Sequence, residues 1–344
     1  MNHFWLIVLV SASFAGALTT VRASPAAQPI NIDLTRWAGP DIAMIGEEPF
    51  GKLVKYGHAL FTDTANQIGP AVSDPKMRFA GNNLACQNCH LRAGTKPYAM
   101  PLIGIWGQFP QYRAREGGVD TLEDRINGCM ERSMNGRVLP LDSREMKAFS
   151  SYMRWLSTGV PDGAKLTGAG TLLINEPERA ADPARGAQVY AQICAVCHGS
   201  DGLGRRAQNG AGYEFPPLWG PDSFNNGAGM ARLLTTAAYA MHNMPIGTTF
   251  DAPVIGDEDV YDVAAYIISQ ERPQKANLDN DFPTRLQKPI DTPYGPYADG
   301  LTVEQHTFGP FGAIRAKVRE LAVGSGVANI GGADNGSDEH RHVR

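Results

Sequence analysis

Apolar side chains recur at helical spacing in four stretches of the chain, and these stretches form two similar pairs. In residues 56–61 and 185–190, two large side chains lie three and four positions after a glycine, so they share one face of a helix. Residues 142–156 and 257–267 begin with acidic residues and continue with apolar ones at the same spacing. Acidic residues in a first turn favour the helix dipole, so the pattern predicts two pairs of amphipathic helices.

A cysteine motif follows the first helix of each pair, and the two copies are 108 residues apart. At the spacing Cys-x-x-Cys-His, two thiols can bond to the vinyl groups of one porphyrin, and the histidine lies under the iron. A thioredoxin-like pair would not require the histidine, and a zinc site would need two further ligands close by. We therefore predict two covalently bound haems of the c type. The residues are Cys86, Cys89 and His90 in the first motif and Cys194, Cys197 and His198 in the second.

The order helix, cysteine motif, loop, helix resembles the class I cytochrome c fold, whose first and last helices cross over the haem edge. The predicted fold class is mainly α, with two class I cytochrome c domains joined by a linker rich in Gly, Ala and Pro. Prolines after Arg272 exclude one long helix, so we predict an irregular C-terminal strap packed against the domains. The predicted segments are a signal peptide (1–23), the haem 1 domain (24–159), the linker (160–181), the haem 2 domain (182–272), the strap (273–323) and a disordered tail (324–344).

The first 23 residues contain a short apolar run and a small-residue cleavage pattern before Ser24, which predicts a secretory signal peptide. The run has few flanking positive charges, so an uncleaved anchor is an alternative, although the run is short for a spanning helix. Haems of the c type are attached outside the cytoplasm, so we expect a periplasmic protein. Cleavage removes one Arg and no acid, which moves the formal net charge from −4 to −5 and gives no support to a nucleic-acid or membrane-surface partner.

The second iron needs a sixth ligand from the loop before the last helix. Met244 precedes a proline and follows His198 by forty-six residues, which matches the usual ligand loop of class I cytochromes. A thioether ligand would raise the potential of this haem. Met241 and His242 are competing ligands, and Met244 could instead fill a gap in the core.

The loop after His90 offers four candidate ligands for the first iron. Met100 follows His90 by only ten residues, which leaves little chain to reach the opposite face of a porphyrin. Cys129 follows by thirty-nine residues, close to the spacing in the second domain, and a thiolate would lower the potential of the iron. Met130 and Met134 are further candidates. Cys129 could also be a buried thiol that packs as a small hydrophobe, although an unpaired cysteine is unusual in an exported protein.

Arginine is the only cation between Pro97 and Met146. Its planar paired donors suit oxyanions such as sulfonate, carboxylate or phosphate. These side chains could instead neutralise haem propionates or pair with nearby acidic residues, and composition leaves the two interpretations equally open. A thiolate beside guanidinium groups has a lowered pKa, which would keep Cys129 available as ligand or nucleophile. The six residues are Arg113, Arg115, Arg125, Arg132, Arg137 and Arg144.

The sequence resembles the dihaem thiosulfate dehydrogenases, also called tetrathionate reductases, over nearly all of the predicted mature chain. The resemblance rests on both cysteine motifs, the loop around Met244 and the segments 125–137 and 288–300. It implies that haem 1, with histidine and cysteine ligands, joins two thiosulfates into tetrathionate, and that haem 2 passes the electrons on. Some members have a lysine at Asn243 that competes with the adjacent methionine, so here we expect Met244 to stay on the iron in both redox states. The implied active-site residues are Cys129 as the iron ligand and Arg115, Arg125 and Ser133 lining the substrate site.

The expected chemistry also fits the residues. Attack of the Cys129 thiolate on tetrathionate would release thiosulfate and leave a mixed species on the cysteine. Arg115 and Arg125 would hold sulfonate oxygens, Ser133 would add a hydrogen bond, and an external cytochrome c would collect the electrons one at a time. The alternatives are a non-catalytic dihaem electron carrier, a cytochrome subunit similar to SoxA that acts on a partner protein, and a dihaem peroxidase.

Overall fold

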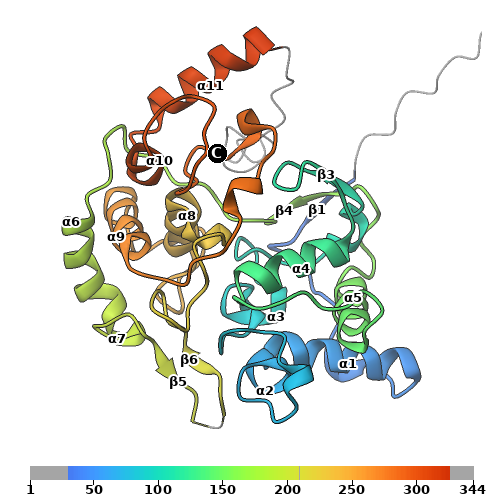
Figure 1. The fold of residues 1–344 in the computed structure, drawn as a ribbon. Helices are drawn as coiled ribbons and strands as arrows, with labels where there is room; N and C mark the ends of the chain where they lie inside the picture. The colour runs from blue at the N-terminus through green and yellow to red at the C-terminus, as the bar shows by residue number, and fades with distance from the viewer. Residues whose placement is uncertain (1–29, 209, 326–344) are drawn as a thin grey trace, which may run out of the picture.

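The computed structural model describes residues 30–208 and 210–325. The predicted signal peptide and the predicted tail beyond residue 325 lie outside these residues. Two mainly helical domains lie side by side, with α1 to α5 in the first and α6 to α9 in the second (Figure 1). No helix among the described residues is long and apolar enough to cross a membrane.

The first domain is built around the crossing of its first and last helices, α1 (Pro49–Thr62) and α5 (Arg144–Leu156). Gly57 lies at the crossing, where a Cβ atom would overlap the carbonyl group of Ala148. Phe61, Phe149 and Tyr152 are buried in the core between them, as the apolar pattern predicts. The other helices are α2 (Thr64–Ile68), the single turn α3 (Leu91–Gly94) and α4 (Leu122–Arg132).

The second domain repeats this crossing with α6 (Pro183–Val189) and α9 (Asp257–Ser269). Gly186 takes the place of Gly57, because a Cβ atom there would overlap the carbonyl group of Asp262. The helix predicted for residues 257–267 is therefore present and packs as its pattern requires. The remaining helices are a π-helical turn (Tyr190–Cys194), α7 (Ala195–His198) and α8 (Leu233–Asn243).

Within the described part of the chain, three short two-stranded sheets complete the domains. In the first sheet, Leu166 packs against Leu34 and Ile103, so the start of the predicted linker belongs to the first domain. The sheets pair β1 (Asn31–Asp33) with β4 (Lys165–Thr167) in parallel, and β2 (Gln111–Arg113) with β3 (Gly118–Asp120) and β5 (Arg205–Arg206) with β6 (Tyr213–Phe215) in antiparallel orientation.

The C-terminal strap is only partly as predicted. It is irregular as far as Thr302, but the chain then forms α10 (Val303–Phe308) and α11 (Gly312–Ser325), so the prediction of an irregular strap through residue 323 is wrong for its last part. Ile314 and Val318 of α11 are buried four residues apart against the core of the second domain. This apolar spacing is the helical signal that the proline-rich start of the strap obscured. Single 3-10 turns lie at Ile42–Met44, Pro75–Met77, Cys86–Asn88, Ile105–Gln108, Gly229–Ala231, Leu278–Asn280 and Arg285–Gln287.

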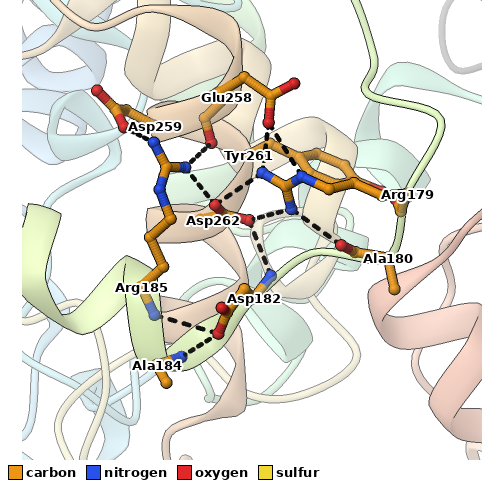
Figure 2. Close-up of polar contacts among 9 residues, drawn as sticks. All are labelled: Arg179, Ala180, Asp182, Ala184, Arg185, Glu258, Asp259, Tyr261 and Asp262. Carbon is orange, nitrogen blue, oxygen red and sulfur yellow. Dashed lines mark hydrogen bonds and ion pairs between the residues drawn. The ribbon is translucent and has the colours of Figure 1, made fainter.

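A buried carboxylate joins α9 to the segment that leads into α6. Asp262 is 0% exposed and lies between the guanidinium groups of Arg179 and Arg185 (Figure 2). The Asp262 carboxylate accepts hydrogen bonds from Arg179 Nη1 at 2.7 Å and from the backbone N–H of Asp182 at 2.8 Å. Burial alone would raise the pKa of Asp262, but these hydrogen bonds and those from Arg185 hold it below its usual value.

Replacing Asp262 by asparagine is expected to destabilise the second domain by about 2–3 kcal/mol, because it leaves two guanidinium groups without their shared anion. Urea unfolding, followed by far-ultraviolet circular dichroism, measures the change. The matched control is Glu258→Gln, which removes an exposed carboxylate that pairs with Arg179. This change should destabilise the protein by less than about 1 kcal/mol. Equal unfolding midpoints for the two variants would show that the buried carboxylate has no special role.

Candidate functional site

A cavity of about 440 Å³ lies in the first domain, between the first cysteine motif and α4. Its volume is within the range of ligand and cofactor pockets. The motif contributes Cys86, Cys89 and His90 to its wall, and α4 contributes Cys129. The structure therefore brings together the first cysteine motif and the remaining cysteine of the chain.

The two motif histidines are held in the way that metal-binding histidines usually are. Nδ1 of His90 lies 2.6 Å from the carbonyl oxygen of Met100, and Nδ1 of His198 lies 2.7 Å from that of Pro216. A carbonyl oxygen can only accept, so each Nδ1 donates and each Nε2 is left for an iron atom. Both histidines therefore fit haem ligation. The carbonyl group of Met100 is the one that holds His90 in this orientation.

One face of α4 is directed into the cavity. Arg125, Cys129 and Ser133 are spaced four residues apart and all line it, and the helix is capped by Thr121. Nη1 of Arg125 donates to Sγ of Cys129 at 2.8 Å. The sequence prediction that placed Cys129, Arg125 and Ser133 in one site is consistent with this arrangement.

The three thiols of the cavity differ in their pKa values. Burial raises the pKa of Cys86 and of Cys89 to about 12. Burial also acts to raise the pKa of Cys129, but the Arg125 guanidinium and the His90 ring outweigh it and bring the pKa down to about 6. Cys129 is therefore the most acidic of the three cysteine side chains in the cavity.

Arg115 is the one predicted active-site residue that does not line this cavity. Its Nη1 donates to the carbonyl oxygen of Gly227 at 2.7 Å and lies 3.5 Å from the carboxylate of Asp281, and its guanidinium lies over the ring of Phe282. Arg113 lines the cavity instead. Gln111 and Arg113 are two residues apart on β2, so both point to the same face of the strand. The sequence alone could not show this, because it did not reveal where so short a strand begins and ends.

The second domain closes part of the same cavity. Phe224 and Met230 line it, although both lie far along the chain from α4. Asn225 fixes this segment to the end of α4, because its Nδ2 donates to the carbonyl oxygen of Glu131 at 2.8 Å and to Oδ1 of Asn135 at 3.0 Å. The cavity is therefore complete only when both domains are in contact.

The candidate ligands of the second site lie at the end of α8. Met241 is 9% exposed and packs in the core of the second domain. Nδ1 of His242 donates to the carbonyl oxygen of Ala238 at 2.9 Å, so this ring is held by the backbone. Met244 is half-buried and follows the helix in an extended conformation. Of the predicted alternatives, this geometry leaves Met244 the most available.

The two candidate haem sites are linked by contacts between α8 and the loop after the first motif. Nδ2 of Asn243, beside Met244, donates to the carbonyl oxygen of Tyr98 at 3.1 Å. Tyr239, one turn earlier, is buried beside Cys89, and its hydroxyl lies 3.5 Å from the carbonyl oxygen of Asn88. Few residues therefore separate the first cysteine motif from the ligand loop of the second.

Comparison with known proteins agrees with this organisation. Residues 77–161 match the SoxA/TsdA cytochrome c domain, and residues 181–267 match the family described as cytochrome c oxidase, cbb3-type, subunit III. The predicted fold class of two cytochrome c domains is thereby confirmed, with one cysteine motif in each.

Several relatives are similar over most of the chain. A thiosulfate dehydrogenase from Stutzerimonas stutzeri is 38% identical over 288 residues, which cover 81% of this chain and 89% of the relative. One from Allochromatium vinosum is 41% identical over 240 residues, covering 68% of this chain and 83% of the relative. A solved structure, thiosulfate dehydrogenase (TsdBA) from Marichromatium purpuratum in its as-isolated form, superposes with a TM-score of 0.64 at 37% identity. That match covers 71% of this chain and 51% of the chain in that structure.

Proposed function

The chain belongs to the thiosulfate dehydrogenase family, and from this membership we propose that it oxidises two thiosulfate ions to one tetrathionate ion in the cavity around Cys129. One observation carries the proposal: a cysteine of lowered pKa lies beside a guanidinium group in the same cavity as the first cysteine motif. A carrier cytochrome has no need of such a thiolate. The reaction releases two electrons, which leave through the second domain.

We assign the cofactors by the residues available to hold them. One haem would be bonded to Cys86 and Cys89 and ligated by His90 and Cys129. When bound, the two haems accept the electrons singly and pass them on. The other haem would be bonded and ligated in the second domain by Cys194, Cys197, His198 and Met244.

The side chains of the cavity account for the sulfur chemistry in both directions. In the reductive direction the Cys129 thiolate attacks a central sulfur of tetrathionate, releases one thiosulfate and retains the other as a cysteine S-thiosulfonate. Two electrons then cleave the new S–S bond, which regenerates the thiolate and frees the second thiosulfate. Arg125 binds a sulfonate group and offsets repulsion between the dianions, and Ser133 donates a hydrogen bond. Oxidation follows the same steps in reverse.

The periplasm is the compartment we propose, with an external cytochrome c as the electron acceptor. Free thiosulfate is expected to reduce ferricyanide or cytochrome c in the presence of the purified dihaem protein, with one tetrathionate formed for every two electrons. Ion chromatography measures the product. Failure to turn over free thiosulfate would contradict the proposal: activity only with a sulfur-carrying partner protein would indicate a function similar to SoxA, and hydrogen peroxide turnover would indicate a peroxidase.

A further inference from the structure

The hairpin of β2 and β3 presents two polar side chains to the haem 1 cavity. Gln111 and Arg113 are two residues apart on β2, and both line the cavity. Tyr112 lies between them and points the other way, where its hydroxyl donates to Oε1 of Gln287 at 2.7 Å. Alternation along the strand therefore directs Arg113 at the same space as Arg125 and Cys129.

The guanidinium of Arg113 is free to bind an anion. Among residues 30–208 and 210–325 it makes no hydrogen bond, and its ion pair with Glu116 is long, at 4.0 Å. Its side chain is 29% exposed, so a small ion can reach it. Five donors on a planar cation suit a sulfonate group, which presents three oxygens.

Arg115 has the opposite surroundings. Its donors are used by Gly227 and Asp281, and the same carboxylate accepts from Arg132 at 2.6 Å and from the hydroxyl of Tyr294 at 2.7 Å. Gly227 lies in the second domain and Asp281 in the strap, so Arg115 connects both to the first domain. Arg115 thus holds the segment that carries Phe224 and Met230 to the cavity.

The charge of the substrates requires more than one cation. Two thiosulfate dianions bring four negative charges beside a thiolate, and at short range like charges repel by several kcal/mol where solvent is partly excluded. Arg125 supplies one positive charge and already donates to Cys129. A second guanidinium on β2, facing the one on α4, would hold the two sulfonate groups apart while the sulfur atoms approach each other.

We propose that Arg113 and Arg125 together bind the sulfonate groups of the substrates, and that Arg115 is a positioning residue that holds the Phe224–Met230 segment against the cavity. The inference rests on the proposed function and names the anion-binding residues of that site. The competing role for Arg113 is contact with a haem propionate.

The decisive variant is Arg113→Gln in the dihaem protein, compared with Arg113→Lys and with the control Arg154→Gln, an exposed arginine over Trp106 outside the cavity. Loss of one charge-assisted contact is expected to raise the KM for thiosulfate by about 10- to 100-fold, with partial recovery in Arg113→Lys and no change in the control. The dissociation constant of tetrathionate, measured by titration of the oxidised protein, should rise in parallel. The potential of haem 1 should stay at its wild-type value.

Each other outcome has a definite meaning. An unchanged KM with a shifted haem 1 potential assigns Arg113 to a propionate and overturns the inference, while thiosulfate oxidation by the wild type keeps the proposed function. No thiosulfate oxidation by the wild type would overturn both. If Arg113→Gln loses haem 1, the same comparison is made with Arg113→Lys, where a wild-type KM would again overturn the inference.

The positioning role of Arg115 has its own test. Arg115→Gln and Asp281→Asn should lower kcat/KM by similar factors, and the double variant should be no worse than either, because both act on one segment. Fully additive effects, with a raised KM only in Arg115→Gln, would show that Arg115 binds substrate directly.

Discussion

Replacing Cys129 by glycine is expected to lower thiosulfate oxidation by at least about 1000-fold, the scale of loss when the nucleophile is removed from a catalytic unit. The variant loses both roles that we propose for this side chain, axial ligation of the first iron and transient bonding to sulfur. Because a thiolate lowers the potential of a haem, the potential of haem 1 should rise. Steady-state kinetics, the absorption and electron paramagnetic resonance spectra of haem 1, and a potentiometric titration measure these effects together.

The neighbouring position provides a matched control for Cys129. A Cβ atom added at Gly128 meets no atom within 4 Å, and Gly128 does not line the cavity. Gly128→Ala should therefore keep wild-type activity and an unchanged haem 1 spectrum. If Cys129→Gly retained both properties as well, the cysteine would be a buried thiol of an electron carrier, and the proposed chemistry would be wrong.

Local sequence patterns were sufficient to predict the parts of the fold that depend on neighbouring residues. The helices around Gly57 and Gly186 follow from apolar side chains three and four positions away, and the structure uses both glycines at helix crossings. The helix α4 was not predicted, because Cys129 was placed in the loop after His90; the structure shows a helix there, and Arg125, Cys129 and Ser133 share one side of it.

The partners of the site depend on contacts that no local pattern contains. The family resemblance implied that Arg115 lines the substrate site, and no local pattern could place Asp281 of the strap beside it. The contribution of Met230 to the haem 1 cavity was missed for the same reason, since it requires the two domains to be docked. In the strap, prolines were correctly taken to exclude one long helix, but they say nothing of the two helices that begin after Thr302.

Asn243, at the end of α8, makes buried polar contacts that connect the two candidate haem sites. Asn243 is 1% exposed, and its Nδ2 donates to the carbonyl oxygens of Tyr98 and Tyr239, while its Oδ1 has no partner among the described residues. A buried polar atom without a partner costs about 1–3 kcal/mol. Asn243 adjoins Met244 and also contacts the first domain through Tyr98. It therefore fixes the ligand loop relative to the first cysteine motif, although its unpaired Oδ1 destabilises the fold.

Replacing Met244 by leucine is expected to lower the potential of haem 2 by on the order of 100 mV, because a thioether ligand raises a haem potential and axial ligands set potentials over about 0.8 V. About 59 mV corresponds to a tenfold change for one electron, so 100 mV makes transfer from haem 1 to haem 2 about fifty-fold less favourable. Thiosulfate oxidation should then slow while tetrathionate reduction is retained, which shifts the preferred direction of the enzyme. Protein-film voltammetry with both substrates measures the potential of haem 2 and the preferred direction of catalysis.

The matched control is Met241→Leu, which changes a core methionine three residues away. If that variant, and not Met244→Leu, lowers the potential of haem 2, then Met241 is the ligand.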